Sequence, residues 1–165
     1  MTTKPTPFKD IIGQTAAKKQ LNFYLRGFDA TGIVPHIMLV APKGAGKTMI
    51  GKQFGREMKA LAQKHGITKK IVTINCAGIR SLDSFLNDYI IPYCIDDDCT
   101  LFLDECSELP KDVTMALLTI TNPNPEKRNE FSYEDYNVVF DFRRLSFMFA
   151  TTEGQSIFHA LMDRM

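Results

Sequence analysis

The chain has 165 residues, of which 44% are hydrophobic and 24% charged, with a net charge of +1. This length supports one domain with a buried core, and the composition excludes a disordered or fibrous chain. No apolar run is long enough to cross a bilayer and no apolar stretch follows the first residues, so we expect a cytoplasmic protein without a membrane partner.

Hydrophobic periodicity predicts strands that alternate with helices. We expect helices over residues 14–28, 48–65, 81–90, 112–121 and 155–165, and strands over 36–40, 71–74, 101–103 and 145–151. Residues 1–9 are expected to be extended, and residues 126–141 to form a β-hairpin before the last strand. The alternation indicates an α/β fold with a mainly parallel sheet between two helical layers, in one domain over residues 1–165.

The charge is distributed unevenly along the chain. Residues 1–82 contain 14 Lys or Arg and 3 Asp or Glu, whereas residues 83–165 contain 6 and 16, so the two parts carry +11 and −10. Three interpretations are open: two solvated faces, a basic surface that contacts the acidic surface of another copy, or a basic patch for nucleic acid.

A glycine-rich loop, Ala41–Thr48, follows a predicted strand and opens a predicted helix. This context is typical of a P-loop, in which backbone N–H groups surround phosphate oxygens. Lys47 is expected to reach the β- and γ-phosphates, and the Thr48 hydroxyl to bind magnesium. The pattern therefore predicts a site for ATP with Mg²⁺, with nucleotide contacts from Pro42, Lys43, Gly44, Ala45, Gly46, Lys47, Thr48 and Met49.

Ala41 stands where the P-loop pattern has its first glycine. If this position required a positive φ, alanine would cost about 1–2 kcal/mol. The second half of the loop keeps Gly44 and Gly46, so we expect the substitution to be tolerated. GTP is disfavoured as the nucleotide because the sequence lacks an Asn-Lys-x-Asp motif.

Two further strands are predicted to deliver catalytic groups at their carboxyl ends, where α/β sheets bind ligands. Asp104 and Glu105 follow the apolar strand 101–103. Asp104 is expected to hold the magnesium ion, and Glu105 to activate the attacking water as a general base. Thr151 or Thr152, at the end of the strand 145–151, is expected to contact the γ-phosphate or the water.

Taken together, these segments resemble the AAA+ ATPases and, within them, the RuvB-type branch-migration motors. The resemblance is carried by Phe8–Gln14, the P-loop, Leu101–Glu105, Phe149–Glu153 and Leu161–Met165. It implies that Ile11 and Ile12 lie against the adenine. It also implies that Arg164 acts in trans, as an arginine finger in the ATP site of a neighbouring subunit.

The resemblance further implies a ring-forming, DNA-processing motor that acts in repair, recombination or replication. The hairpin over 126–141 would contact a protein adaptor. Clamp-loader subunits share most of these features, so a clamp-loader-type ATPase is an alternative, as is a nucleotide-dependent interaction module with little hydrolysis. The chain ends at Met165, where the family continues into a helical lid. We therefore expect the large AAA+ subdomain alone, with DNA contacts in the parts that would follow.

Overall fold

The computed structural model describes residues 7–152, 160, 161 and 163–165. Its main sheet has four parallel strands in the order β1-β6-β3-β2. The strands are β1 (Ile37–Val40), β2 (Lys70–Asn75), β3 (Cys99–Asp104) and β6 (Leu145–Thr151). Strand β6 is buried along its whole length because helices cover both faces of the sheet, as is usual for parallel strands. The predicted parallel α/β fold is confirmed.

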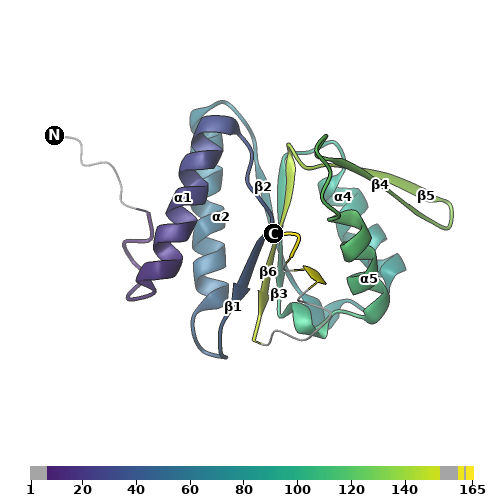
Figure 1. Cartoon of the computed structure of the whole chain (residues 1–165), viewed down its shortest axis with the longest axis horizontal. Helices are drawn as coiled ribbons and strands as arrows, with labels where there is room; N and C mark the ends of the chain where they lie inside the picture. The colour runs from purple at the N-terminus through teal and green to yellow at the C-terminus, as the bar shows by residue number, and fades with distance from the viewer. Residues whose placement is uncertain (1–6, 153–159, 162) are drawn as a thin grey trace.

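Two helical layers enclose this sheet (Figure 1). Helices α1 (Thr15–Thr31) and α2 (Lys47–Lys64) lie on one side, and α5 (Lys111–Ile120) lies on the other with the helical segment Leu82–Cys94. Side chains alternate between the two layers along each strand, so that Phe102 packs toward α1 and α2 while its neighbours in β3 pack toward α5. Among the described residues, no helix is long and apolar enough to span a bilayer.

Helix α2 approaches the sheet closely through two glycines, Gly51 and Gly55. A Cβ atom on Gly51 would lie 2.5 Å from Cζ of Phe102, and one on Gly55 would lie 2.7 Å from Cγ2 of Ile71. Both distances are shorter than van der Waals contact, so any side chain here would push the helix off the sheet. Because α2 begins at Lys47, these two glycines also set the position of the P-loop relative to β3.

The helical segment predicted over 81–90 is longer than expected. It comprises α3 (Leu82–Phe85), one π-helical turn η2 (Leu86–Ile90) and α4 (Ile91–Cys94). Pro92 has no backbone N–H to donate to the preceding turn. The wider π-helical turn before it accommodates this missing hydrogen bond. Ser81 caps the segment in a reciprocal pair with Ser84, at 3.1 and 3.2 Å.

Residues 126–141 contain the antiparallel pair β4 (Arg128–Tyr133) and β5 (Tyr136–Asp141). Figure 1 shows this hairpin projecting on the α5 side of the sheet, with its turn at the end of the molecule far from α1 and α2. The phenol oxygen of Tyr136 donates to Oδ1 of Asn87 at 2.9 Å, which fastens the hairpin to the helical segment.

The two ends of the chain differ from expectation or lie outside the described residues. Residues 7–10 form turns instead of an extended segment, because Phe8 folds inward with a φ of 63° and is only 2% exposed. Residues 1–6 are not described. Of the helix expected over 155–165, residues 160 and 161 are helical, 163 and 164 form a turn, and the remainder falls outside the described residues.

Candidate active site

A cleft of about 660 Å³ opens at the carboxyl ends of β1, β3 and β6. Strand β6 lies between β1 and β3 in the sheet, although it follows both in the sequence. The P-loop and the turn after β3 therefore diverge around the end of β6, where open α/β sheets place their ligands. The cleft is lined by Lys43, Gly44, Gly46, Lys47, Thr48, Met49, Asp104, Glu105, Ser107, Glu108, Thr151 and Thr152.

The P-loop wraps around the ammonium group of Lys47. Gly44 and Gly46 have φ values of 81° and 85°, which side chains disfavour, and Gly46 caps the start of α2. Nζ of Lys47 donates to the carbonyl of Ala41 at 2.6 Å and to that of Pro42 at 3.0 Å. The amino end of an 18-residue helix thus points into a loop in which the ammonium group of Lys47 is directed inward.

Ala41 does not have the positive φ that would make an alanine costly. It is not among the residues with positive φ, and its N–H donates to the carbonyl of Thr151 at 3.3 Å. Ala41 thus continues the pairing of β1 with β6 by one residue. Alanine in place of the first glycine of the P-loop pattern therefore causes no backbone strain in this conformation.

Thr48 and Asp104, 56 positions apart in sequence, meet directly in the cleft. Oγ1 of Thr48 donates to Oδ2 of Asp104 at 2.6 Å. The other carboxylate oxygen, Oδ1, accepts from the N–H of Glu105 at 3.1 Å, which orients the Asp104 side chain. The structure therefore brings together the hydroxyl and the carboxylate that the sequence assigned to magnesium.

Glu105 is exposed and has a left-handed backbone, with φ 55° and ψ 47°. A non-glycine residue in this region costs about 1 kcal/mol, so the conformation is held by its surroundings. Glu105 precedes the short helix η3 (Cys106–Glu108), and its carbonyl accepts from the N–H of Glu108 at 2.9 Å. Strain of this kind is enriched at functional sites. Glu105 lines the cleft.

The two threonines after β6 have different environments. Thr151 is 1% exposed, and its hydroxyl forms a hydrogen bond with the thiol of Cys106. Burial raises the pKa of Cys106 to about 12, although this bond lowers it, so the thiol stays protonated. Thr152 is exposed. Both line the cleft, but Thr152 is the one whose surface is open to a ligand.

Three residues implied by the resemblance lie apart from this cleft. Ile11 is 5% exposed in the core with Phe8 and Phe28, and Ile12 is 97% exposed. Neither lines this cleft or the neighbouring one. The reason is the turn at residues 7–10, which directs Ile11 inward and consequently Ile12 outward. Arg164 is half-buried, and its Nη1 donates to the carbonyl of Ala160 in its own chain.

A second cleft of about 510 Å³ adjoins the P-loop, between α1 and the edge strand β1. Gln14 just before α1, Tyr24 of α1 and His36 before β1 line it. Nε2 of Gln14 donates to the carbonyl of Ala45 at 3.1 Å. Burial lowers the pKa of His36 to about 4, with a smaller contribution from Lys127. Sequence reasoning missed this cleft, and also Ser107 and Glu108 in the first one. No local pattern marks these residues, because chain packing alone brings them together.

The parallel sheet, the inward-facing P-loop and the Thr48–Asp104 pair define the core of a P-loop NTPase. The chain belongs to the ATPase family associated with various cellular activities (AAA), whose model matches residues 37–165. Membership of this family implies nucleotide binding.

Solved structures of RuvB from Thermotoga maritima have the same fold. One described as the Holliday junction branch migration motor has a TM-score of 0.66 and 20% identity over 94% of this chain. A variant of it has a TM-score of 0.67 and 19% identity over 96% of this chain. This chain spans 45% and 46% of those two chains, or about half of their length.

A curated relative is the Lon protease of Desulfatibacillum aliphaticivorans. It is 26% identical over 174 residues, covering 95% of this chain. This chain spans 19% of the length of that protease. The chain is therefore similar to one part of a much longer protein.

Proposed function

We propose that this chain binds ATP with magnesium in the cleft at the end of β6 and hydrolyses the γ-phosphate, in a site completed by a neighbouring copy. The observation that carries the proposal is the convergence of Lys47, Thr48, Asp104 and Glu105 around one cleft, with Thr48 and Asp104 2.6 Å apart. A cation, a helix amino end and two carboxylates in this arrangement suit phosphoryl transfer to water.

The ammonium group of Lys47 can exchange its hydrogen-bond acceptors when ATP binds. Its ammonium group donates to two neutral carbonyls, those of Ala41 and Pro42. Phosphate oxygens carry full negative charge and form stronger hydrogen bonds with a cation. We therefore propose that Lys47 moves from the loop carbonyls to the β- and γ-phosphates, while the N–H groups from Lys43 to Thr48 surround the phosphates and Met49 lines the entrance.

The residues present fit a magnesium ion. Thr48 and Asp104 offer two oxygen donors side by side, the ligand type that Mg²⁺ prefers. In the described part of the chain no cluster of three or more metal-ligating side chains occurs. This agrees with an ion that keeps several waters and takes phosphate oxygens as further ligands. When bound, the ion would neutralise charge on the phosphates.

Hydrolysis is assigned to four further residues. Glu105 accepts a proton from the attacking water as general base. Thr152, the exposed threonine, contacts the γ-phosphate or the water, and Thr151 holds the strand end in place beneath it. Arg164 does not line the cleft of its own chain, which supports a role in the cleft of a neighbour.

For the whole protein, we propose a ring-forming motor that processes DNA. The support is the fold shared with a branch migration motor. The projecting β4–β5 hairpin is the proposed contact for a protein partner. The Lon match favours a second candidate, a motor that acts on polypeptides.

Phosphate release per subunit, measured against protein concentration, tests the shared site. We expect the rate per subunit to rise steeply with concentration, because each site needs an arginine from a second copy. A flat rate near zero, together with tight ATP binding, would instead identify a nucleotide-dependent interaction module. Adding a four-way DNA junction or an unfolded polypeptide then separates the two motors, since each stimulates only the ATPase that acts on it.

A further inference from the structure

A buried thiol lies directly behind the residue proposed as general base. Cys106 follows Glu105, begins the short helix η3 and is fully buried. It does not line the cleft, so the proposed chemistry makes no direct use of it. Glu105 itself is exposed and has a left-handed backbone, which side chains disfavour. The turn that carries Glu105 therefore depends on contacts that hold it in place, and Cys106 supplies one of them.

The contact of Cys106 is with the end of β6. Its thiol and the hydroxyl of Thr151 form a hydrogen bond, and η3 contacts β6. Both side chains are shielded from water, and a hydrogen bond in such a low-dielectric place is stronger than one at the surface. Thr151 directly precedes Thr152, the exposed threonine that lines the cleft. The bond therefore joins the residue after Glu105 to the residue before Thr152.

Thr151 is also joined to the P-loop. Its carbonyl accepts from the N–H of Ala41 at 3.3 Å, and the carbonyl of Ala41 accepts from Nζ of Lys47 at 2.6 Å. Strand β6 lies between β1 and β3, so its end reaches the loops that follow both neighbours. A path of hydrogen bonds thus leads from Lys47 through Ala41 and Thr151 to Cys106, the residue next to Glu105.

We propose that Cys106 is a positioning residue for the hydrolysis step. Through its hydrogen bond with Thr151 it fixes the turn of Glu105 relative to the P-loop, so that the carboxylate of Glu105 meets the water beside the γ-phosphate. Cys106 stays outside the cleft and acts only through these neighbours. The inference rests on the proposed function and deepens it, because it names the group that aligns the general base.

Simple core packing is the alternative role for this thiol, since Cys106 belongs to the core between the sheet and α5. Cys76 separates the two roles. It begins η1 (Cys76–Gly78) after β2, as Cys106 begins η3 after β3, and it is equally buried. Strand β3 separates β2 from β6 in the sheet. Cys76→Ala therefore removes the same sulfur volume and leaves the bond between Cys106 and Thr151 in place.

The test is steady-state ATP hydrolysis by the whole chain. We expect Cys106→Ala to lower kcat about tenfold and to change the KM for ATP by less than about twofold, because the thiol affects alignment and not binding. Cys106→Ser keeps a hydrogen-bonding group and should restore most of the rate. Thr151→Val should resemble Cys106→Ala, and the double variant should lose little more than either single variant, since both remove one shared bond. Cys76→Ala should turn over like the wild type.

Hydrogen exchange without nucleotide adds a readout that does not depend on hydrolysis. The N–H groups of Glu108 and Leu109 donate to the carbonyls of Glu105 and Cys106, at 2.9 and 3.2 Å, so they report on the turn. They should exchange about fivefold faster in Cys106→Ala and at the wild-type rate in Cys76→Ala.

Three outcomes overturn the proposal: wild-type kcat in Cys106→Ala, an equal loss in Cys76→Ala, or no recovery in Cys106→Ser. A wild type that releases no phosphate rejects the proposed ATPase instead. In that case hydrogen exchange decides alone, and unchanged exchange of the Glu108 and Leu109 amides in Cys106→Ala overturns the role of Cys106 in holding the turn.

Discussion

Glu105 follows Asp104 directly, yet the two carboxylates have separate surroundings. Asp104 is held by Thr48 and by the N–H of Glu105, whereas Glu105 is exposed in a left-handed backbone conformation. This separation suits two roles, one carboxylate for the metal and one for the water. The sequence predicted the two roles from residue type and order, and the fold shows that the two neighbours have different surroundings.

Replacing Glu105 tests its proposed role as general base. We expect Glu105→Gln to bind ATP like the wild type and to lower the hydrolysis rate by about 10²–10⁴, the usual contribution of a general base. Glutamine has the same shape as glutamate, so the variant places the same left-handed backbone conformation on residue 105. Glu108→Gln is the matched control, because Glu108 lines the same cleft and carries no assigned role. Wild-type turnover by Glu105→Gln would reject the assignment.

Ala41 allows a test of whether the missing glycine matters. Because its φ is not positive, Ala41→Gly gains no relief of strain and instead increases the entropy of the unfolded chain. We expect the variant to lose about 0.4–1 kcal/mol of unfolding free energy, measured by urea denaturation, with unchanged ATP affinity. A gain in stability or a much tighter nucleotide complex would show that the loop is strained by alanine.

At the scale of elements, helix α2 joins the P-loop to the sheet through its two glycines. The P-loop can meet Asp104 only if α2 lies close to β3, and Gly51 permits this approach by leaving room for Phe102. Periodicity predicted α2 from its apolar stripe. It could not predict the depth of packing, because that depends on side chains from strands distant in sequence.

Gly51→Ala should therefore destabilise the protein, although alanine favours helices. The added Cβ would lie 2.5 Å from Phe102, and overpacking of this kind costs about 1–3 kcal/mol. Gly27→Ala in α1 is the control, since nothing lies within 4 Å of its added Cβ, and it should stabilise the protein by about 0.5–1 kcal/mol. Equal effects of the two variants on the urea midpoint would contradict this account of α2.

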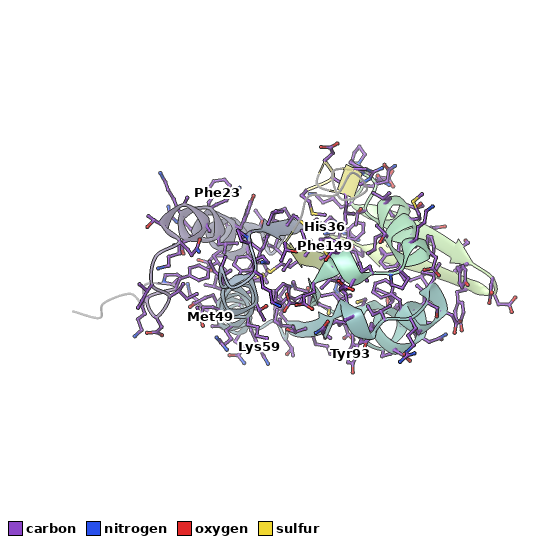
Figure 2. All side chains as sticks on the ribbon, turned by 90° about the horizontal axis from the view of Figure 1, so that it is seen from below. Phe23, His36, Met49, Lys59, Tyr93 and Phe149 are labelled. Atoms are coloured by element: carbon purple, nitrogen blue, oxygen red, sulfur yellow. The ribbon has the colours of Figure 1, made fainter. Side chains whose placement is uncertain are left out.

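His36 links β1, β6 and the end of the hairpin. Its Nδ1 accepts from the N–H of Phe147 at 3.0 Å, and its ring packs edge-on against Phe142, with ring centroids 4.7 Å apart. Figure 2 shows His36 in the middle of the molecule, and its ring also packs against that of Phe147, with centroids 5.4 Å apart. The neutral imidazole therefore belongs to the folded structure, and a proton on it would remove an acceptor.

Burial lowers the pKa of His36 from 6.5 to about 4, so the unfolded chain binds a proton more readily than the folded one. The stability contribution of this group is complete above pH 6.5 and is lost as the pH falls toward 4. We expect a loss of unfolding free energy on the order of 2–3 kcal/mol across this window. His36→Asn keeps an acceptor and should flatten the profile, measured by urea denaturation at several pH values. An unchanged slope would exclude His36 as its source.

For the whole molecule, the decisive question is whether Arg164 serves its own site or that of a neighbour. Its contact with the Ala160 carbonyl and its absence from the cleft lining support the neighbour. Arg164→Ala and Glu105→Gln should each be nearly inactive alone. Mixed, they should recover activity, because one copy supplies the arginine and the other the intact Glu105. No recovery, measured as phosphate release, would mean that the arginine acts within its own chain.

The sequence by itself determined the class of fold, the P-loop, the Asp104–Glu105 pair and the threonines after the last strand. These are local patterns, in which residue type and spacing act through the backbone of one segment. The tertiary structure decided which residues share the cleft, where Ile11 and Ile12 lie, how α2 is seated by Gly51 and Gly55, and which threonine is exposed. Those outcomes depend on packing between segments that are distant in sequence. Such packing is set by the volumes and orientations of side chains from several segments, which a local sequence pattern does not encode.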